Sequence, residues 1–115
     1  MPAADHEQRT REAKDALGRF CAALRGRFGA RVRDLRLFGS FARGDHHEES
    51  DVDVLVVIAE MQERERREIF DVAEEEFFVS LVRIMPLALS DKEYDELVRR
   101  ERLIAKEIAA DGVAL

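Results

Sequence analysis

One continuous run of apolar residues constrains the fold more than any other part of this sequence. The segment DVDVLVVIA begins at Asp51, and its residues 54–59 are all apolar. A strand with one face in water alternates apolar and polar residues, whereas a strand buried on both faces is apolar throughout. We therefore expect an interior strand here, with other elements packed on both faces of its sheet. The run is far too short to cross a bilayer, so we expect no membrane association.

Helical periodicity before this run predicts one of the packing elements. Apolar residues recur at steps of three and four, which places them on one face of an amphipathic helix that ends near Gly29. The only cysteine lies on that face, so we expect a buried, unreactive thiol and a reducing compartment. The residues of this apolar face are Leu17, Phe20, Cys21, Leu24 and Phe28.

Two further segments predict strands. RVRDLRLF (31–38) places Leu35 and Leu37 on one face of a short strand. FFVSLVRIMPLAL (77–89) is rich in apolar residues and predicts a third strand. Its Pro86 has no amide proton to donate, so we expect that residue at the end of the strand or on a sheet edge.

Two more helices are expected. MQERERREIFDVAEEE (61–76) has helical spacing and alternating charges on its solvated side. SDKE (90–93) is a capping box that starts a last helix, and Gly112 is placed to end it. The inward-facing residues are Ile69, Val72 and Ala73 in the first helix, and Tyr94, Leu97, Val98, Ile104 and Ile108 in the last.

The order of these elements predicts an α+β domain, a small sheet flanked by helices. A chain of 115 residues, 46% of them hydrophobic, is expected to fold as a single domain over residues 1–115. The formal net charge of −6 disfavours direct binding of nucleic acid or anionic lipid. The N-terminal residues are polar and contain no apolar signal region, so we expect a cytoplasmic location.

Gly39 and Ser40 follow the first predicted strand and precede FARG, which can form a helical turn. Glycine lets the backbone turn sharply and approach a ligand, and amides at a helix start can bind phosphate beside a serine hydroxyl. A serine in this place is more often a simple N-cap. Taken alone, the pair favours the N-cap interpretation.

Asp51 and Asp53 lie two residues apart on a strand, so both side chains point to one face, roughly 6 to 7 Å apart. Two carboxylates so close stay ionised only when a cation compensates them, and their hard oxygens suit Mg²⁺ or Mn²⁺. An isolated D-x-D is more often the polar end of a loop. If the two strands are neighbours, however, a phosphate turn faces a metal pair, which is the arrangement that a nucleoside triphosphate requires.

The fuller pattern GSFARGD…SDVDVLV resembles the signature of the DNA polymerase β-like nucleotidyltransferase superfamily, and in particular its minimal nucleotidyltransferases. The tail RERLIAKEIAADGVAL is similar to the last helix of that group, so the resemblance covers nearly the whole chain. It implies a nucleotidyltransferase fold and the transfer of a nucleoside monophosphate from an NTP, with ATP expected. It also implies Gly39 and Ser40 as phosphate-binding residues, and Asp51 and Asp53 as the catalytic, metal-binding residues. Arg43 is either a further phosphate contact or a surface arginine.

The resemblance further implies a partner, because minimal members often pair with a HEPN-domain toxin and some add AMP to a tyrosine of it. Active members usually carry a third carboxylate on the strand after the intervening helix, whereas residues 77–90 contain no aspartate or glutamate. Arg83 and Ser80 are poor substitutes on that strand, and Glu76 would serve only if the strand starts earlier. Nucleotide binding tolerates this loss better than catalysis does, because phosphates and water also supply metal ligands.

Three functions stay open at this point. The first is a Mg²⁺-dependent nucleotidyltransferase that modifies a partner protein, and the second is a catalytically degenerate fold that neutralises a toxin by contact. A small-molecule nucleotidyltransferase is the third, and it would need a homodimer to build the acceptor site. The loop DHHEES (45–50) is expected to be solvated rather than a zinc site, because its adjacent histidines rarely converge on one metal. Phe77 and Phe78 are expected in the core or at a partner contact.

Overall fold

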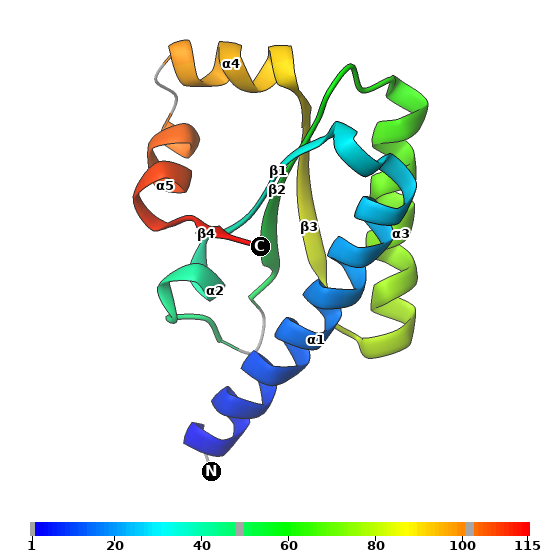
Figure 1. Ribbon diagram of the computed structural model, residues 1–115. Helices are drawn as coiled ribbons and strands as arrows, with labels where there is room; N and C mark the ends of the chain where they lie inside the picture. The colour runs from blue at the N-terminus through cyan, green and yellow to red at the C-terminus, as the bar shows by residue number, and fades with distance from the viewer. Residues whose placement is uncertain (1, 48–49, 101–102) are drawn as a thin grey trace.

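A mixed β-sheet forms the centre of the computed structural model, which describes residues 2–47, 50–100 and 103–115 (Figure 1). Within these residues the sheet has four strands in the order β3-β2-β1-β4. β2 runs antiparallel to β1 and parallel to β3, and β4 is antiparallel to β1. The strands are β1 (Val32–Phe38), β2 (Val52–Ile58), β3 (Ile84–Ser90) and β4 (Val113–Ala114). The predicted α+β class is confirmed, and β4 is a strand that the sequence pattern did not indicate.

Helices cover both faces of the sheet, so the interior strand predicted from the apolar run is confirmed. α1 (Pro2–Phe28) and α3 (Glu63–Ser80) lie on one side, and α4 (Asp91–Arg99) and α5 (Leu103–Asp111) lie on the other (Figure 1). Alternate residues of β2 enter two hydrophobic clusters, one on each side. Val54 and Leu55, which point in opposite directions, are both fully buried. A single strand therefore anchors both halves of the core.

The apolar face of α1 packs against this core as its periodicity predicts. All five residues of that face are buried, and the side chains of Phe20 and Leu24 are almost completely excluded from water. Burial of one such side chain contributes about 1.5–3 kcal/mol. The free thiol of Cys21 is buried, and burial raises its pKa, which agrees with an unreactive cysteine. A short 3₁₀ turn, η1 (Gly29–Arg31), then leads into β1.

The boundary between α3 and β3 corrects the predicted third strand. The helix continues through Ser80, and the strand begins only at Ile84. Aromatic and branched residues at 77–82 suit a strand locally, but the buried stripe of α3 continues past Ala73 to Glu76 at helical steps. The helix ends at Leu81, whose φ of 61° reverses the chain direction. Pro86 lies on edge strand β3, as expected.

The predicted last helix is two helices, α4 and α5. The expected capping box at the start of α4 is present, because the amide of Glu93 donates to the Ser90 hydroxyl at 3.1 Å. α5 ends at Asp111, and the amide of Gly112 donates to the carbonyl of Ile108 at 2.8 Å. Ile108 is fully buried, whereas Tyr94 and Leu97 are half-buried and Val98 is exposed. The side chain of Ile104 lies outside the described residues.

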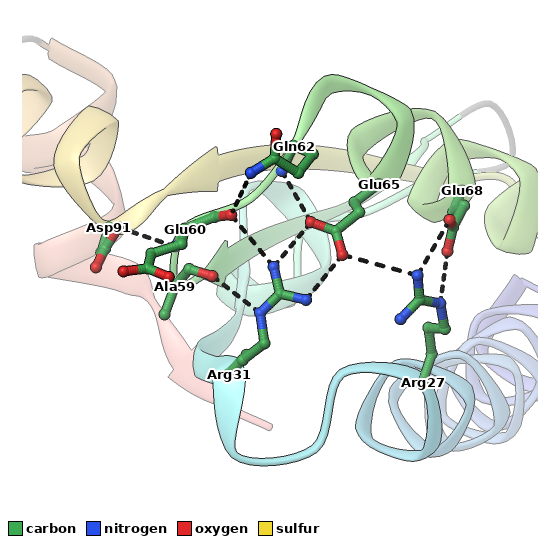
Figure 2. Close-up of polar contacts among 8 residues, drawn as sticks. All are labelled: Arg27, Arg31, Ala59, Glu60, Gln62, Glu65, Glu68 and Asp91. Carbon is green, nitrogen blue, oxygen red and sulfur yellow. Dashed lines mark hydrogen bonds and ion pairs between the residues drawn. The ribbon is translucent and has the colours of Figure 1, made fainter.

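An ion-pair network around the buried Glu65 joins η1 to the start of α3 at the far end of β2 (Figure 2). Glu65, near the start of α3, accepts hydrogen bonds from the guanidinium of Arg31 at 2.7 and 2.8 Å and from the Gln62 amide at 2.8 Å. Those bonds hold the pKa of Glu65 at about 2, so the carboxylate is ionised at neutral pH. Arg31 also donates to the carbonyls of Ala59 and Glu60, which joins η1 to the turn after β2. This network lies at the end of β2 opposite Asp53.

Across the described ranges, no helix is both long enough and apolar enough to cross a membrane.

Candidate functional site

The turn after β1 has the geometry of a ligand-binding backbone. Gly39 has φ 75° and ψ −155°, a region that only glycine occupies readily, and it is the N-cap of α2 (Ser40–Arg43). Its carbonyl accepts the amides of Ala42 and Arg43, both at 3.1 Å. The intrahelical bonds therefore begin at Ala42, and the amides of Ser40 and Phe41 precede them. Backbone donors at the start of such a turn can bind an anionic oxygen.

The turn lies directly against Asp53. β1 and β2 are adjacent and antiparallel, and their register pairs Phe38 with Asp53. A Cβ added at Gly39 would lie 2.4 Å from the Oδ2 atom of Asp53, closer than two non-bonded atoms can approach. The sequence expectation that the glycine turn faces the aspartate pair is thus met for Asp53, because the two strands are neighbours.

Asp51 lies just before β2 and lines a cavity of about 580 Å³. Its carboxylate is 3.7 Å from the guanidinium of Arg83, and the Arg83 carbonyl accepts the Val52 amide at 2.9 Å. Phe77 and Leu81, from the end of α3 and the residue after it, line the same cavity. Asp51 is therefore open to a ligand from this side, and Arg83 partly compensates its charge.

Arg43 lies at the end of α2, where its exposed side chain pairs with carboxylates. Its guanidinium donates to Asp45 at 3.2 Å and to Glu107 at 3.0 Å, and lies 3.9 Å from Asp111. Glu107 and Asp111 belong to α5, so this arginine joins the helix after the turn to the last helix. Sequence reasoning missed Glu107. The sequence around Glu107 did not indicate a site residue, because helical periodicity does not show which distant residues a helix will contact.

The carboxylates around Asp53 disfavour its charge. Burial raises the pKa of Asp53, the negative charges of Asp51 and Glu107 raise it further, and Arg43 opposes them. A divalent cation would relieve this repulsion, and two carboxylates with hard oxygens suit Mg²⁺, which completes its shell with phosphate and water. Among the described side chains, no three histidines, cysteines or acids converge as a ready-made metal site. A cation held by Asp51 and Asp53 would therefore take its other ligands from outside the described side chains.

The strand register shows which residue lies beside Asp53 on the next strand, where a third carboxylate was sought. β2 and β3 are parallel, and Asp53 pairs with Met85, so these two side chains share a face of the sheet. Met85 is exposed and offers no metal ligand. The sequence also offered Glu76 as a substitute, and this prediction is wrong. Glu76 lies on α3, and its carboxylate accepts a hydrogen bond from the Arg19 guanidinium at 2.6 Å. Ser80 donates its hydroxyl to the Glu76 carbonyl at 2.9 Å, so it too is turned to the helix.

The loop between α2 and β2 differs from the solvated loop expected. His46 is only 6% exposed, and its ring stacks between those of His6 and Phe41. His47 instead lines the cavity beside Asp51, so the two adjacent histidines point to different places. Residues 48 and 49 of this loop lie outside the described ranges.

Phe78 is 74% exposed, and Val79 and Leu81 beside it are exposed as well. Of the two positions expected for this phenylalanine, the core is excluded and a partner contact stays a prediction. Phe77 is half-buried and lies against the guanidinium of Arg83.

Comparison with known proteins identifies the family and the fold of this chain. The profile of the family described as "Nucleotidyltransferase domain" matches residues 17–113. Two proteins of Methanocaldococcus jannaschii, named "Putative protein adenylyltransferase MJ0604" and "Putative protein adenylyltransferase MJ0141", are 48% and 55% identical over 42 and 38 residues. These segments are 36% and 32% of this chain and span only 42% and 38% of the two relatives. A solved structure titled "Crystal structure of the toxin-antitoxin with AMP-PNP" superposes with a TM-score of 0.56 at 16% identity, over 83% of this chain and 68% of that chain, and so shares the fold.

Proposed function

This chain belongs to the nucleotidyltransferase domain family, and from that premise we propose that it transfers AMP from ATP to a hydroxyl group of a partner protein. The observation that carries the proposal is the contact between the Gly39 turn and the carboxylate of Asp53. A turn that binds phosphate oxygens, next to a carboxylate that binds a metal ion, can together hold one metal-bound triphosphate. A protein that acts by surface contact alone would need neither a phosphate-binding turn nor a metal-binding carboxylate.

Each site residue has a defined role in this proposal. The amides of Ser40 and Phe41 and the Ser40 hydroxyl bind the β- and γ-phosphates, and Gly39 allows the backbone to approach them. Asp51 and Asp53 would hold Mg²⁺, which when bound neutralises phosphate charge and orients the triphosphate. Arg43 gives a further phosphate contact when its guanidinium turns from Glu107.

The reaction is a displacement at the α-phosphorus. The acceptor hydroxyl oxygen forms a bond to the α-phosphorus, the bond from that phosphorus to the bridging oxygen of pyrophosphate breaks, and the hydroxyl proton is released. Catalysis of this kind depends mainly on positioning and charge neutralisation. Asp51 is best placed to meet the acceptor, because it opens on the cavity of about 580 Å³ that Phe77 and Leu81 also line.

The acceptor is proposed to be a HEPN-domain toxin, which would supply the hydroxyl from outside this chain. Three observations support a protein acceptor. The two curated relatives carry protein adenylyltransferase in their names, and the superposed structure is a toxin–antitoxin complex with a nucleotide analogue. Beside the site, the described residues expose apolar side chains at the end of α3, which suits contact with another protein.

Transfer is tested by incubating the protein with Mg²⁺, a purified HEPN-domain protein, and ATP labelled on either the α- or the γ-phosphate. We expect label on the partner from the α-labelled ATP only, and none with the Asp53→Asn variant. The Ile69→Val variant serves as a matched control, because it changes the core without touching the site. Label from the γ-phosphate, or equal transfer by Asp53→Asn, would contradict the proposal.

The second candidate is a binding antitoxin that neutralises its partner by contact, without chemistry. Met85 favours it, since this residue occupies the position opposite Asp53 where a third carboxylate would lie. In that case the Asp51→Asn/Asp53→Asn double variant would neutralise the toxin as well as the wild type does. A growth-rescue assay that compares the two chains distinguishes the candidates, because the enzyme requires both aspartates.

A further inference from the structure

The buried ring of His46 joins two parts of the protein that are distant in sequence. Its centroid lies 4.1 Å from the His6 ring and 3.9 Å from the Phe41 ring, with interplanar angles of 18° and 9°. His6 belongs to α1, and Phe41 belongs to the helical turn that follows Gly39. This three-ring stack therefore connects the first turns of α1 to the candidate phosphate-binding turn.

A hydrogen bond to Thr10 defines which nitrogen of His46 carries the proton. The Thr10 hydroxyl donates to the His6 carbonyl at 2.9 Å, so its oxygen can only accept from the His46 Nε2 atom, 2.9 Å away. His46 is then the neutral tautomer with its proton on Nε2. Its Nδ1 atom is buried and has no hydrogen-bond partner in the described structure. A proton added at Nδ1 would place a charge inside the stack.

The groups around the ring oppose that charge. Burial is the main cause that lowers the pKa of His46, and His6 and Arg9 of α1 lower it further. The Ser40 carbonyl, on α2, and Asp45, in the loop, act in the opposite direction. The neutral ring is thus favoured in the closed stack. Below the ordinary histidine pKa of about 6.5, an opened stack takes up the proton more readily than the closed one, so falling pH favours opening.

The position of His46 makes the stack relevant to the site. The loop from Gly44 to Ser50 connects the end of α2 to Asp51, and His46 is the buried residue among the described members of that loop. The same stack holds Phe41, whose amide is one of the two donors at the turn. Opening it would therefore release Phe41 at the turn, together with Asp45 and His46 at the end of α2.

We propose that His46 is a positioning residue of the nucleotide site: its neutral ring holds Phe41 and the end of α2 to α1, and its protonation releases them and weakens binding of magnesium-ATP. Its effect on nucleotide rests on the function proposed above. The contact formed by His6, Thr10, Phe41 and His46, which we call the clasp, does not depend on that function.

Two measurements test the clasp without nucleotide. Long-range ¹⁵N NMR of the imidazole should show the tautomer with the proton on Nε2 at about pH 7.5. Amide protection factors of Gly44 and Asp45, which both donate to the Ser40 carbonyl, should fall several-fold between about pH 7.5 and about pH 5.5. In His46→Phe, which keeps a flat ring but cannot titrate, they should stay constant. Protonation on Nδ1, or the same loss of protection in His46→Phe, would overturn the proposal.

The link to the site is measured by titrating the full chain with ATP and Mg²⁺ at both pH values. We expect the wild type to lose affinity several-fold more than His46→Phe and His46→Gln do on acidification; comparison at each pH removes the titration of ATP itself and of Asp53. An equal loss in all three chains would overturn the positioning role while the proposed function stands. If the wild type binds no ATP at about pH 7.5, the proposed function and the positioning role both fail, and the protection factors still decide whether the clasp exists.

Discussion

Replacing Gly39 with alanine adds one methyl group at the point where the candidate phosphate turn meets Asp53. The change has two separate costs. The backbone at φ 75° and ψ −155° is strained for any residue with a Cβ atom, at about 1–3 kcal/mol. The new Cβ would also lie 2.4 Å from the Oδ2 atom of Asp53, so the carboxylate must rotate away.

The backbone strain mainly lowers stability, whereas the displaced carboxylate mainly lowers ligand affinity. Unfolding entropy of about 2.1 cal/mol/K per residue over 115 residues makes 1 kcal/mol equal to about 4 °C in Tm, so the strain lowers Tm by about 4–12 °C. Rotation of a carboxylate at the end of a side chain adds little to that loss. For ligand binding, however, the moved carboxylate no longer faces the turn, and we expect magnesium-dependent ATP affinity to fall at least about tenfold.

Gly44→Ala is the matched control. Gly44 also has a positive φ, 81°, but nothing lies within 4 Å of a Cβ added there. Its strain of about 1–2 kcal/mol lowers Tm by about 4–8 °C and should leave ATP affinity within about threefold of the wild type. Thermal melts and calorimetric titration of both variants give the comparison. Equal affinities for Gly39→Ala and Gly44→Ala would refute the argument that the turn and Asp53 bind one ligand.

Three further predictions follow from the same structure. Arg43→Ala should weaken ATP binding by about tenfold, since a charge-assisted contact to phosphate is lost; unchanged affinity in calorimetry would make Arg43 a surface residue. Glu65→Gln should lower Tm at neutral pH. The variant should also lose less stability than the wild type on acidification, because it no longer has this carboxylate to protonate. The pKa of Glu65 is held at about 2, below its ordinary 4.5, so its stabilisation is present above about pH 4.5 and lost as the pH falls towards 2. Melts of both chains across this range check it, and parallel curves would contradict the assignment. Ile69→Val, in the core away from the site, should cost about 1 kcal/mol and leave ATP affinity unchanged; a binding defect there would show that the two measurements are not independent.

Much of the fold was predictable because burial leaves a periodic pattern in the sequence. The steps of three and four from Leu17 to Phe28 identified α1, and the continuous apolar run identified β2 as an interior strand. The contact between Gly39 and Asp53 was predictable for a different reason: adjacent antiparallel strands bring the end of one beside the start of the next.

Features that depend on distant contacts were not predictable. The segment from Phe77 to Ser80 suits a strand locally, yet it completes α3 and leaves Phe78 exposed. Burial of His46 depends on α1 extending to the loop, which no local pattern shows. Glu107 reaches the neighbourhood of Asp53 only because α5 packs beside β1, and the two-residue strand β4 is too short to leave a pattern.

Calorimetric titration with ATP, with and without Mg²⁺, tests the central claim most directly when the wild type is compared with the Asp51→Asn/Asp53→Asn double variant. We expect the wild type to bind ATP in a magnesium-dependent way and the variant to lose that binding while it keeps its Tm. Absence of magnesium-dependent binding in the wild type, or equal binding by the variant, would contradict a nucleotide site built from the Gly39 turn and the two aspartates.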